Sequence, residues 1–115
     1  GVEDLYGHPV AGASWEGWVL EQLARQLAPR WHLAFYRTAA GAELDVVAEK
    51  GRRRLGFEIK LSSAPTVSKG FWQAVADVKP ERTYLIAPVE SGYPLAKNVE
   101  VLPAHELGNG IPDAK

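Results

Sequence analysis

Residues 43–61 read ELDVVAEKGRRRLGFEIKL and form two arms that each alternate between apolar and polar side chains. An alternation with a period of two is typical of half-buried β-strands. The segment KGRR between the arms supplies a glycine and polar residues, so the arms are predicted to pair as an antiparallel hairpin. One face of this hairpin is expected to carry Leu44, Val46, Ala48, Leu55, Phe57, Ile59 and Leu61.

The other face of the predicted hairpin brings acidic side chains together. With the turn centred in KGRR, Asp45 lies opposite Glu58, and Glu43 lies opposite Lys60. Side chains directly opposite one another are roughly 5 Å apart, and like charges there are destabilising. Full solvation, a shared proton or a divalent cation would relieve the two acids, and Mg²⁺ prefers one or two carboxylates plus water. Because Lys60 shares their face, Asp45, Glu58 and Lys60 are predicted to form a metal and phosphate site, unless this face is simply solvated.

The composition is that of an ordinary globular domain. At 115 residues, of which 46% are hydrophobic, the chain is long enough for one domain with a real core. Its net charge of −1 gives no global signal for nucleic acid or membrane binding. It has no cysteine, hence no disulfide framework, and no apolar run approaches the roughly 18 residues of a membrane span. We expect a cytoplasmic protein without a membrane segment, and the absence of methionine indicates a piece of a longer protein.

Apolar spacing and turn residues divide the rest of the chain into helices and strands. The predicted order is helix 14–27, strand 31–38, hairpin 43–61, helix 68–78, strand 82–87 and strand 99–102. The segment 89–98 is predicted to be a loop, and the residues from 103 onward a ragged tail. The first helix is expected to bury Leu20, Leu23 and Leu27, with Trp15 and Val19 alongside.

Several charged residues admit two interpretations each. Glu16 stands at the head of the helical stripe, four residues before Leu20, so it is either a first-turn acid favoured by the helix dipole or a member of the site. Arg37 is either a phosphate contact or half of a salt bridge. Glu43 either pairs with Lys60, which we favour, or supports a metal.

Basic residues at two turns are candidates for phosphate contacts. The hairpin turn carries a cluster that either is solvated or grips a nucleic-acid backbone, namely Lys50, Arg52, Arg53 and Arg54. Lys69, beside Gly70 at a predicted helix start, is a further phosphate-binding candidate.

The order of elements, with Asp45 on the second strand and Glu58-Ile59-Lys60 on the third, resembles the PD-(D/E)XK, restriction-endonuclease-like nuclease superfamily. The resemblance implies an α/β (α+β) fold with the order α-β-β-β-α-β, a mixed sheet of four or five strands and a helix on each face. It also implies a catalytic Mg²⁺ or Mn²⁺ ion. Its ligands would be Asp45, Glu58, the carbonyl of Ile59 and Glu16, and Lys60 would position or activate the attacking water.

A narrower resemblance concerns a domain found in longer proteins. The segments GASWEG (12–17), FYRT (35–38), GAELD (41–45) and EIK (58–60) look like the uncharacterised C-terminal domain fused to bacterial and archaeal AAA-type ATPases. This implies a lead-in 1–11 from an upstream ATPase module, a restriction-endonuclease-like domain 12–103 and a tail 104–115. The chain has no Gly-rich phosphate loop ending in Lys-Ser/Thr, so it is not expected to bind ATP by that route. Leu44 stands where the superfamily motif has proline, which makes the short motif less specific.

Two functions follow as expectations. The first is a metal-dependent nuclease domain that hydrolyses DNA phosphodiester bonds, in which the cation activates water and Lys60 stabilises developing negative charge. The second is a catalytically inactive nuclease-fold module that binds DNA or a protein partner and regulates the attached ATPase. The near-neutral charge favours the second function, and the retained acids and lysine favour the first. A dimerisation domain, indicated only by the many tryptophan and apolar residues, ranks third.

Overall fold

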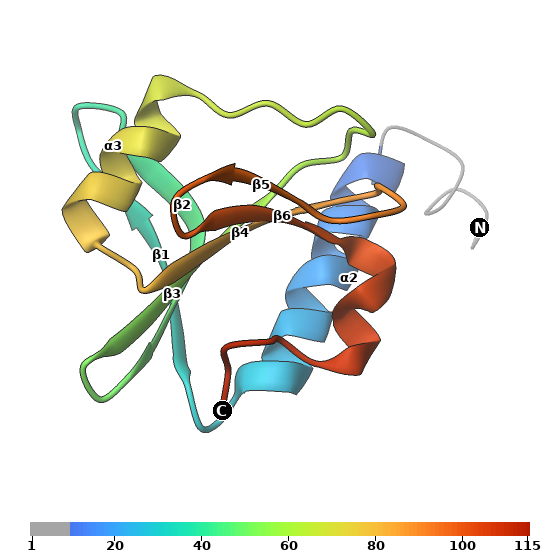
Figure 1. The fold of residues 1–115 in the computed structure, drawn as a ribbon, viewed down its shortest axis with the longest axis horizontal. Coiled ribbons are helices and arrows are strands. Elements are labelled where there is room, and N and C mark those ends of the chain that lie inside the picture. The colour runs from blue at the N-terminus through green and yellow to red at the C-terminus, as the bar shows by residue number, and fades with distance from the viewer. Residues whose placement is uncertain (1–9) are drawn as a thin grey trace.

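The computed structural model of the chain describes residues 10–115, with side chains from residue 15 onward. Within this range the fold is α+β, with a six-stranded mixed sheet and a helix packed on each of its faces (Figure 1). The elements are α2 (Val10–Leu27), β1 (His32–Arg37), β2 (Glu43–Lys50), β3 (Arg53–Ile59), α3 (Lys69–Val78), β4 (Arg82–Ala87), β5 (Tyr93–Ala96), β6 (Val99–Pro103) and the 3₁₀ helix η1 (Ala104–Asn109). No helix in this part of the chain has the length and apolarity needed to cross a membrane.

The sheet order is β1-β2-β3-β4-β6-β5. The first three strands form an antiparallel meander, whereas β3, β4 and β6 run parallel and β5 returns antiparallel to β6. Parallel neighbours require a crossover, and α3 supplies the one between β3 and β4. The strand predicted at 82–87 is confirmed as β4, and its central position explains why its sequence is almost continuously apolar.

Helix α2 covers one face of the sheet through Val19, Leu23 and Leu27, which are fully buried. These residues are spaced by four, so they follow one side of the helix. Leu20 was predicted to belong to this stripe, but it is 44% exposed. It lies about 100° around the helix from Val19 and therefore points past the core. The lead-in was expected to reach residue 11, but α2 already begins at Val10, and residues 1–9 lie outside the described part.

Helix α3 covers the opposite face and begins and ends as its sequence predicts. The Ser68 side chain accepts a hydrogen bond from the Phe71 N–H at 3.2 Å, which caps the first turn. Lys79 adopts the left-handed conformation after the last turn, and its N–H donates to the Val75 carbonyl. Gly70 packs so closely against the β1–β2 turn that a Cβ there would lie 2.2 Å from the Gly41 carbonyl oxygen. Only glycine lets α3 begin at this place.

Two segments predicted to be irregular are structured. The predicted loop 89–98 contains β5, and because β5 is an edge strand it accommodates Pro94. The predicted tail 104–115 forms η1 and then packs Ile111 and Ala114 into the core on the α2 face. The Trp31 indole N–H donates to the Ala114 carbonyl at 3.2 Å, which holds the tail against the start of β1. The sheet therefore has six strands rather than four or five.

Candidate functional site

An extra residue in β2 positions Asp45. Ala34 pairs with Val47 and Tyr36 pairs with Leu44, so three steps along β2 match two steps along β1. Such a bulge re-aims the side chains beside it. Leu44 consequently packs with Val47 in the core cluster under α3, whereas Val46 packs in the cluster under α2. The predicted common face of Leu44 and Val46 is therefore wrong, because regular alternation stops at the bulge.

The predicted register of the β2–β3 hairpin is confirmed, and the carboxylates continue it where the backbone ladder ends. Strand pairing runs from Lys50–Arg53 at the turn to Val46–Phe57. Beyond this point the Asp45 N–H donates to Glu58 Oε1 at 3.1 Å. The Ile59 N–H donates to Asp45 Oδ2 at 2.8 Å. Each carboxylate thus uses one oxygen to join the two strands and keeps the other oxygen for a further partner.

Glu58 is buried next to this like charge. Its side chain is 6% exposed, and Lys60 Nζ lies 3.9 Å from Glu58 Oε2. Burial and the neighbouring Asp45 raise the pKa of Glu58 to about 7, while the Asp45 N–H and Lys60 act in the opposite direction. At neutral pH the Glu58 carboxyl therefore exchanges readily between its protonated and ionised forms. A group in this condition is suited to bind a cation in place of a proton.

The other candidate residues lie apart from this pair. Glu16 is exposed on α2, and among the described residues no three acidic, histidine or cysteine side chains form a metal-holding group. Glu43 was predicted to pair with Lys60, but its carboxylate lies 4.0 Å from Arg37 instead. The bulge explains this difference, because it changes the aim of the side chains that precede it on β2. The role of Glu16 as a third ligand stays a prediction.

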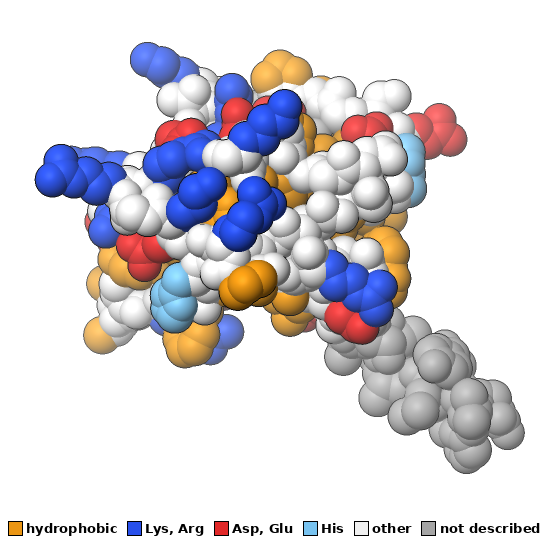
Figure 2. All heavy atoms as spheres, turned by 90° about the horizontal axis from the view of Figure 1, so that it is seen from below, with side chains coloured by type: hydrophobic (Ala, Val, Ile, Leu, Met, Phe, Trp, Pro, Cys, Tyr) orange, Lys and Arg blue, Asp and Glu red, His pale blue; other side chains and the backbone are white. Residues whose placement is uncertain are grey.

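The basic cluster lies at the opposite end of the hairpin. Arg53 and Glu58 are five steps apart along an extended strand, which is about 17 Å. Figure 2 shows Lys and Arg side chains gathered on the underside of the molecule, where the β2–β3 turn lies. Arg53 is bound to Glu81 at 2.8 Å and Arg54 to Glu49 at 3.0 Å. These two arginines are therefore engaged in ion pairs within the fold, whether or not they also contact a ligand.

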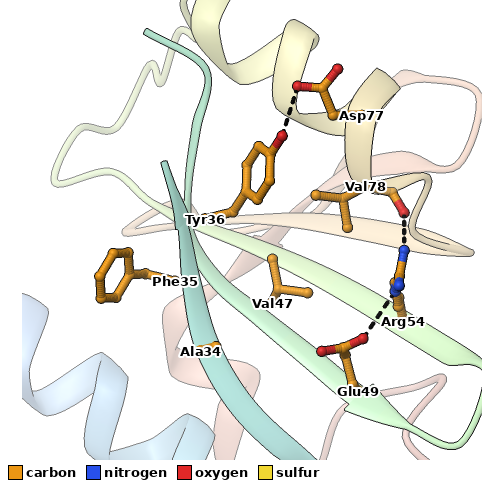
Figure 3. Close-up of a pocket in the computed structure, with 8 residues that line it drawn as sticks. All are labelled: Ala34, Phe35, Tyr36, Val47, Glu49, Arg54, Asp77 and Val78. Carbon is orange, nitrogen blue, oxygen red and sulfur yellow. Dashed lines mark hydrogen bonds and ion pairs between the residues drawn. The ribbon is translucent and has the colours of Figure 1, made fainter. Parts of the chain in front are cut away.

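Hydrogen bonds also hold together a pocket between β1, β2, β3 and α3 (Figure 3). The Tyr36 hydroxyl donates to Asp77 at 2.9 Å, and Arg54 donates to the Val78 carbonyl at 3.1 Å. Hydrogen bonding to this acid raises the pKa of Tyr36. The pocket does not include Asp45 or Glu58, so it is separate from the carboxylate pair.

A second hollow does reach Asp45, and sequence reasoning missed it. It measures about 380 Å³ and opens on the α2 side of β1 and β2. Its lining consists of Asp45 and apolar residues, namely Leu20, Leu23, Leu33, Ala34, Phe35 and Val46. Phe35 is 70% exposed although it belongs to a strand. A large aromatic residue on an edge strand was the available signal, but the exposure of Phe35 depends on which strand lies at the edge.

The sequence is similar to that of proteins without an assigned function. Residues 11–107 match the family described as "Domain of unknown function (DUF4143)". The chain is 42% identical over 110 residues to "Uncharacterized protein Rv2008c" of Mycobacterium tuberculosis and to "Uncharacterized protein Mb2031c" of Mycobacterium bovis. Each match covers 93% of this chain and 25% of the relative, so the chain spans a quarter of the length of these curated relatives. No solved structure matches the chain.

Proposed function

We propose that this chain, which belongs to the DUF4143 family, is a Mg²⁺- or Mn²⁺-dependent nuclease domain that hydrolyses DNA phosphodiester bonds. The observation that carries the proposal is the pairing of the buried Glu58 carboxylate with the half-buried Asp45 carboxylate, with Lys60 beside them. Two acids and one lysine leave a local negative charge that a hard divalent cation would neutralise. A surface that only binds a partner gains nothing from such a pair, because like charges at close range lower stability.

The residues present fit a divalent cation. Asp45 and Glu58 each have one oxygen that is not used in joining β2 to β3. The Ile59 N–H faces Asp45, and in an extended strand the carbonyl of the same residue points to the same side. These three oxygen donors are the ligand type that Mg²⁺ and Mn²⁺ prefer. When bound, the cation polarises the scissile phosphate and lowers the pKa of its water.

Side chains and backbone groups of the chain would stabilise charge, release a proton and orient the carboxylates. Lys60 places a positive charge next to Glu58, where it stabilises negative charge that develops on the phosphate oxygens. Glu58, with a pKa of about 7, releases its proton near neutral pH and so makes the pair available to the cation. The hydrogen bonds from the Asp45 and Ile59 N–H groups hold both carboxylates in fixed orientations.

The decisive experiment is a calorimetric titration of Mn²⁺ into the chain, paired with cleavage assays on single-stranded, duplex and branched DNA. We expect saturable Mn²⁺ binding and metal-dependent cleavage, both lost in Glu58→Gln. Glutamine keeps the shape and one acceptor oxygen but removes the charge. The exposed residue Glu90 provides the matched control, and Glu90→Gln should leave both activities unchanged. Absence of Mn²⁺ binding together with absence of cleavage on every DNA form would refute the proposal.

The inactive module is the second candidate, and one observation favours it. Because backbone N–H groups already satisfy one oxygen of each acid, the pair keeps the strands together without a cation. In that case the domain would bind DNA or a protein partner and regulate an attached ATPase. DNA binding that needs no metal and is unchanged in Glu58→Gln, without cleavage, would support this function.

We also propose the setting in which the domain works. Its relatives are about four times its length, which agrees with a domain joined to a larger module such as an AAA-type ATPase in the cytoplasm. Measuring cleavage by one full-length relative with and without ATP would test this, because a coupled nuclease should respond to the nucleotide. An equal rate under both conditions would argue against coupling.

A further inference from the structure

The hollow beside Asp45 has an unusual mouth. Phe35 lies on the edge strand β1 and is 70% exposed, and Leu20 on α2 is 44% exposed. Both residues line the same hollow as Asp45. Figure 3 shows the Phe35 ring on the opposite side of β1 from Tyr36. The two apolar side chains thus flank one concave surface rather than being scattered singly.

This exposure is costly unless something covers the surface. Phe35 is 70% exposed and therefore forgoes most of the hydrophobic stabilisation that burial of its ring would give. Single exposed apolar residues need no explanation, but an apolar concavity rimmed by charge is typical of a binding site. The charge here comes from Arg37, whose guanidinium lies 5.4 Å from the centroid of the Phe35 ring. An aromatic face next to a positive charge matches the chemistry of a nucleotide.

We propose that this hollow binds one unstacked nucleobase, with Phe35 as its stacking platform, so that the site acts on single-stranded DNA. The inference rests on the proposed nuclease function and adds its substrate class. A base is flat and uncharged, so it suits an apolar hollow, whereas a phosphate does not. In a duplex both faces of each base are covered by its neighbours, so only a single-stranded or frayed base can enter.

The position of Asp45 connects the base to the chemistry. Asp45 lines the hollow and is also a member of the carboxylate pair, held to β3 by the hydrogen bond from the Ile59 N–H. A base in the hollow therefore brings its own phosphodiester next to the proposed cation site. Arg37 lies beside the Phe35 ring and would supply a positive charge for the flanking phosphate. The specificity arises from stacking and is tolerant of base identity.

The test measures fluorescence anisotropy of an end-labelled oligothymidylate and of a blunt duplex, both in EDTA so that no cleavage occurs. Loss of one stacked base should raise the dissociation constant of Phe35→Ala for the single strand by about fivefold or more. Phe35→Trp should retain the affinity of the unmodified chain. Tyr93 is a matched exposed aromatic on the other edge strand, and Tyr93→Ala should have no effect. Binding to the duplex should be equal in all variants.

The possible outcomes distinguish failure of the base site from failure of the proposed nuclease function. Single-strand binding that depends on Phe35, without metal-dependent cleavage, would support the base site and refute the nuclease. Cleavage with equal single-strand affinities for Phe35→Ala and the unmodified chain would overturn the base site alone. The remaining alternative is that Phe35 belongs to an interface between the β1 edge strands of two copies of the chain. Analytical ultracentrifugation tests this alternative. If Phe35→Ala converts a dimer to a monomer and leaves oligonucleotide affinity unchanged, the inference is overturned.

Discussion

The two ends of strand β3 hold charged side chains in opposite ways. At its first residue, Arg53 donates hydrogen bonds of 2.8 and 3.1 Å to the two oxygens of Glu81. Towards its other end Glu58 lies beside Asp45, with Lys60 at 3.9 Å as the nearby positive charge. The bond to Arg53 holds the pKa of Glu81 below its usual value, whereas burial beside Asp45 raises the pKa of Glu58 to about 7.

The difference is between a pair of opposite charges, Arg53 with Glu81, and a pair of like charges, Glu58 with Asp45, that one lysine balances only in part. Opposite charges in a bidentate geometry stabilise the fold as it stands. Like charges at a buried position reduce stability until a proton or a cation is supplied. The same strand therefore carries one end with a satisfied ion pair and another end whose stability depends on what is bound. Measurements of stability against pH and metal should distinguish the two ends.

The largest effect should come from Glu58→Gln. A pKa raised from 4.5 to about 7 means that the unfolded chain releases this proton at lower pH than the folded chain. The contribution of Glu58 to the free energy of unfolding is therefore fully present below about pH 4.5. It is lost as the pH rises through about 7, which lowers the stability by on the order of 3 kcal/mol. Glutamine cannot ionise, so the variant should lack this decline and exceed the unmodified chain in stability at alkaline pH.

Urea unfolding across this pH range gives the measurement, with Glu90→Gln as the control. Added Mn²⁺ should restore the stability of the unmodified chain at alkaline pH and leave Glu58→Gln unchanged. Parallel curves of stability against pH for the unmodified chain and Glu58→Gln would contradict the assignment of the decline to Glu58.

Arg53→Ala should have the next largest effect. Besides binding Glu81, Arg53 donates to the carbonyls of Asp113 and Lys115, and its guanidinium lies 5.0 Å from the Trp31 ring centroid. Because the pair with Glu81 is partly exposed, it accounts for only part of the loss, and the rest should come from releasing the tail. We expect a measurable loss of stability in urea unfolding and faster amide exchange in residues 111–115.

The neighbouring Arg52 supplies the control for this experiment. It is exposed at the hairpin turn, and no ion pair or hydrogen bond of its side chain occurs within the described residues. Arg52→Ala should therefore change stability by less than about 0.5 kcal/mol. Equal effects of the two substitutions would show that turn charge, rather than the tail contacts, is responsible.

Lys60→Gln should act through Glu58 and should change stability by less than about 1 kcal/mol, because Lys60 is partly exposed. The positive charge of Lys60 lowers the pKa of Glu58, so its removal should raise that pKa further. The decline in stability should then move to higher pH, and metal-dependent cleavage should be lost. A midpoint that stays in place or moves to lower pH would argue against this coupling.

Glu16→Gln should have the smallest effect. Glu16 is exposed, so its substitution should leave stability within about 0.5 kcal/mol and Mn²⁺ affinity nearly unchanged. The measurement is a calorimetric titration of Mn²⁺ into Glu16→Gln and, for comparison, into Glu58→Gln. A loss of affinity as large as that of Glu58→Gln would show that α2 brings Glu16 to the site when the cation binds.

Local patterns predicted much of the fold because local chemistry determines those parts. Gly51 fixes the turn, and the turn fixes the register that puts Asp45 beside Glu58. Ser68 marks the start of α3, and Lys79 follows its end. In each case the deciding residues lie within a few positions of the feature, so a single sequence is enough to find it.

The features that sequence reasoning missed depend on distant contacts. The bulge in β2 follows from its pairing with β1, and it redirects Leu44 in a way that a period of two does not predict. The order of the tail depends on Trp31 and Arg53, which are some sixty or more residues away along the chain. The exposure of Phe35 follows from the position of β1 at the sheet edge. Each of these requires the topology first.

The close packing of Gly70 on Gly41 determines where this chain will accept a foreign sequence. An insertion between Ala40 and Gly41 would push against the first turn of α3, because no free space separates the two segments. The turn at Gly51 and Arg52 is different, since nothing lies within 4 Å of a Cβ built on Gly51 and both residues are exposed. An affinity tag or fluorescent reporter placed between Gly51 and Arg52 would extend into solvent, at the end of the hairpin remote from the carboxylate pair. That turn is the natural attachment point for surface immobilisation or single-molecule labelling.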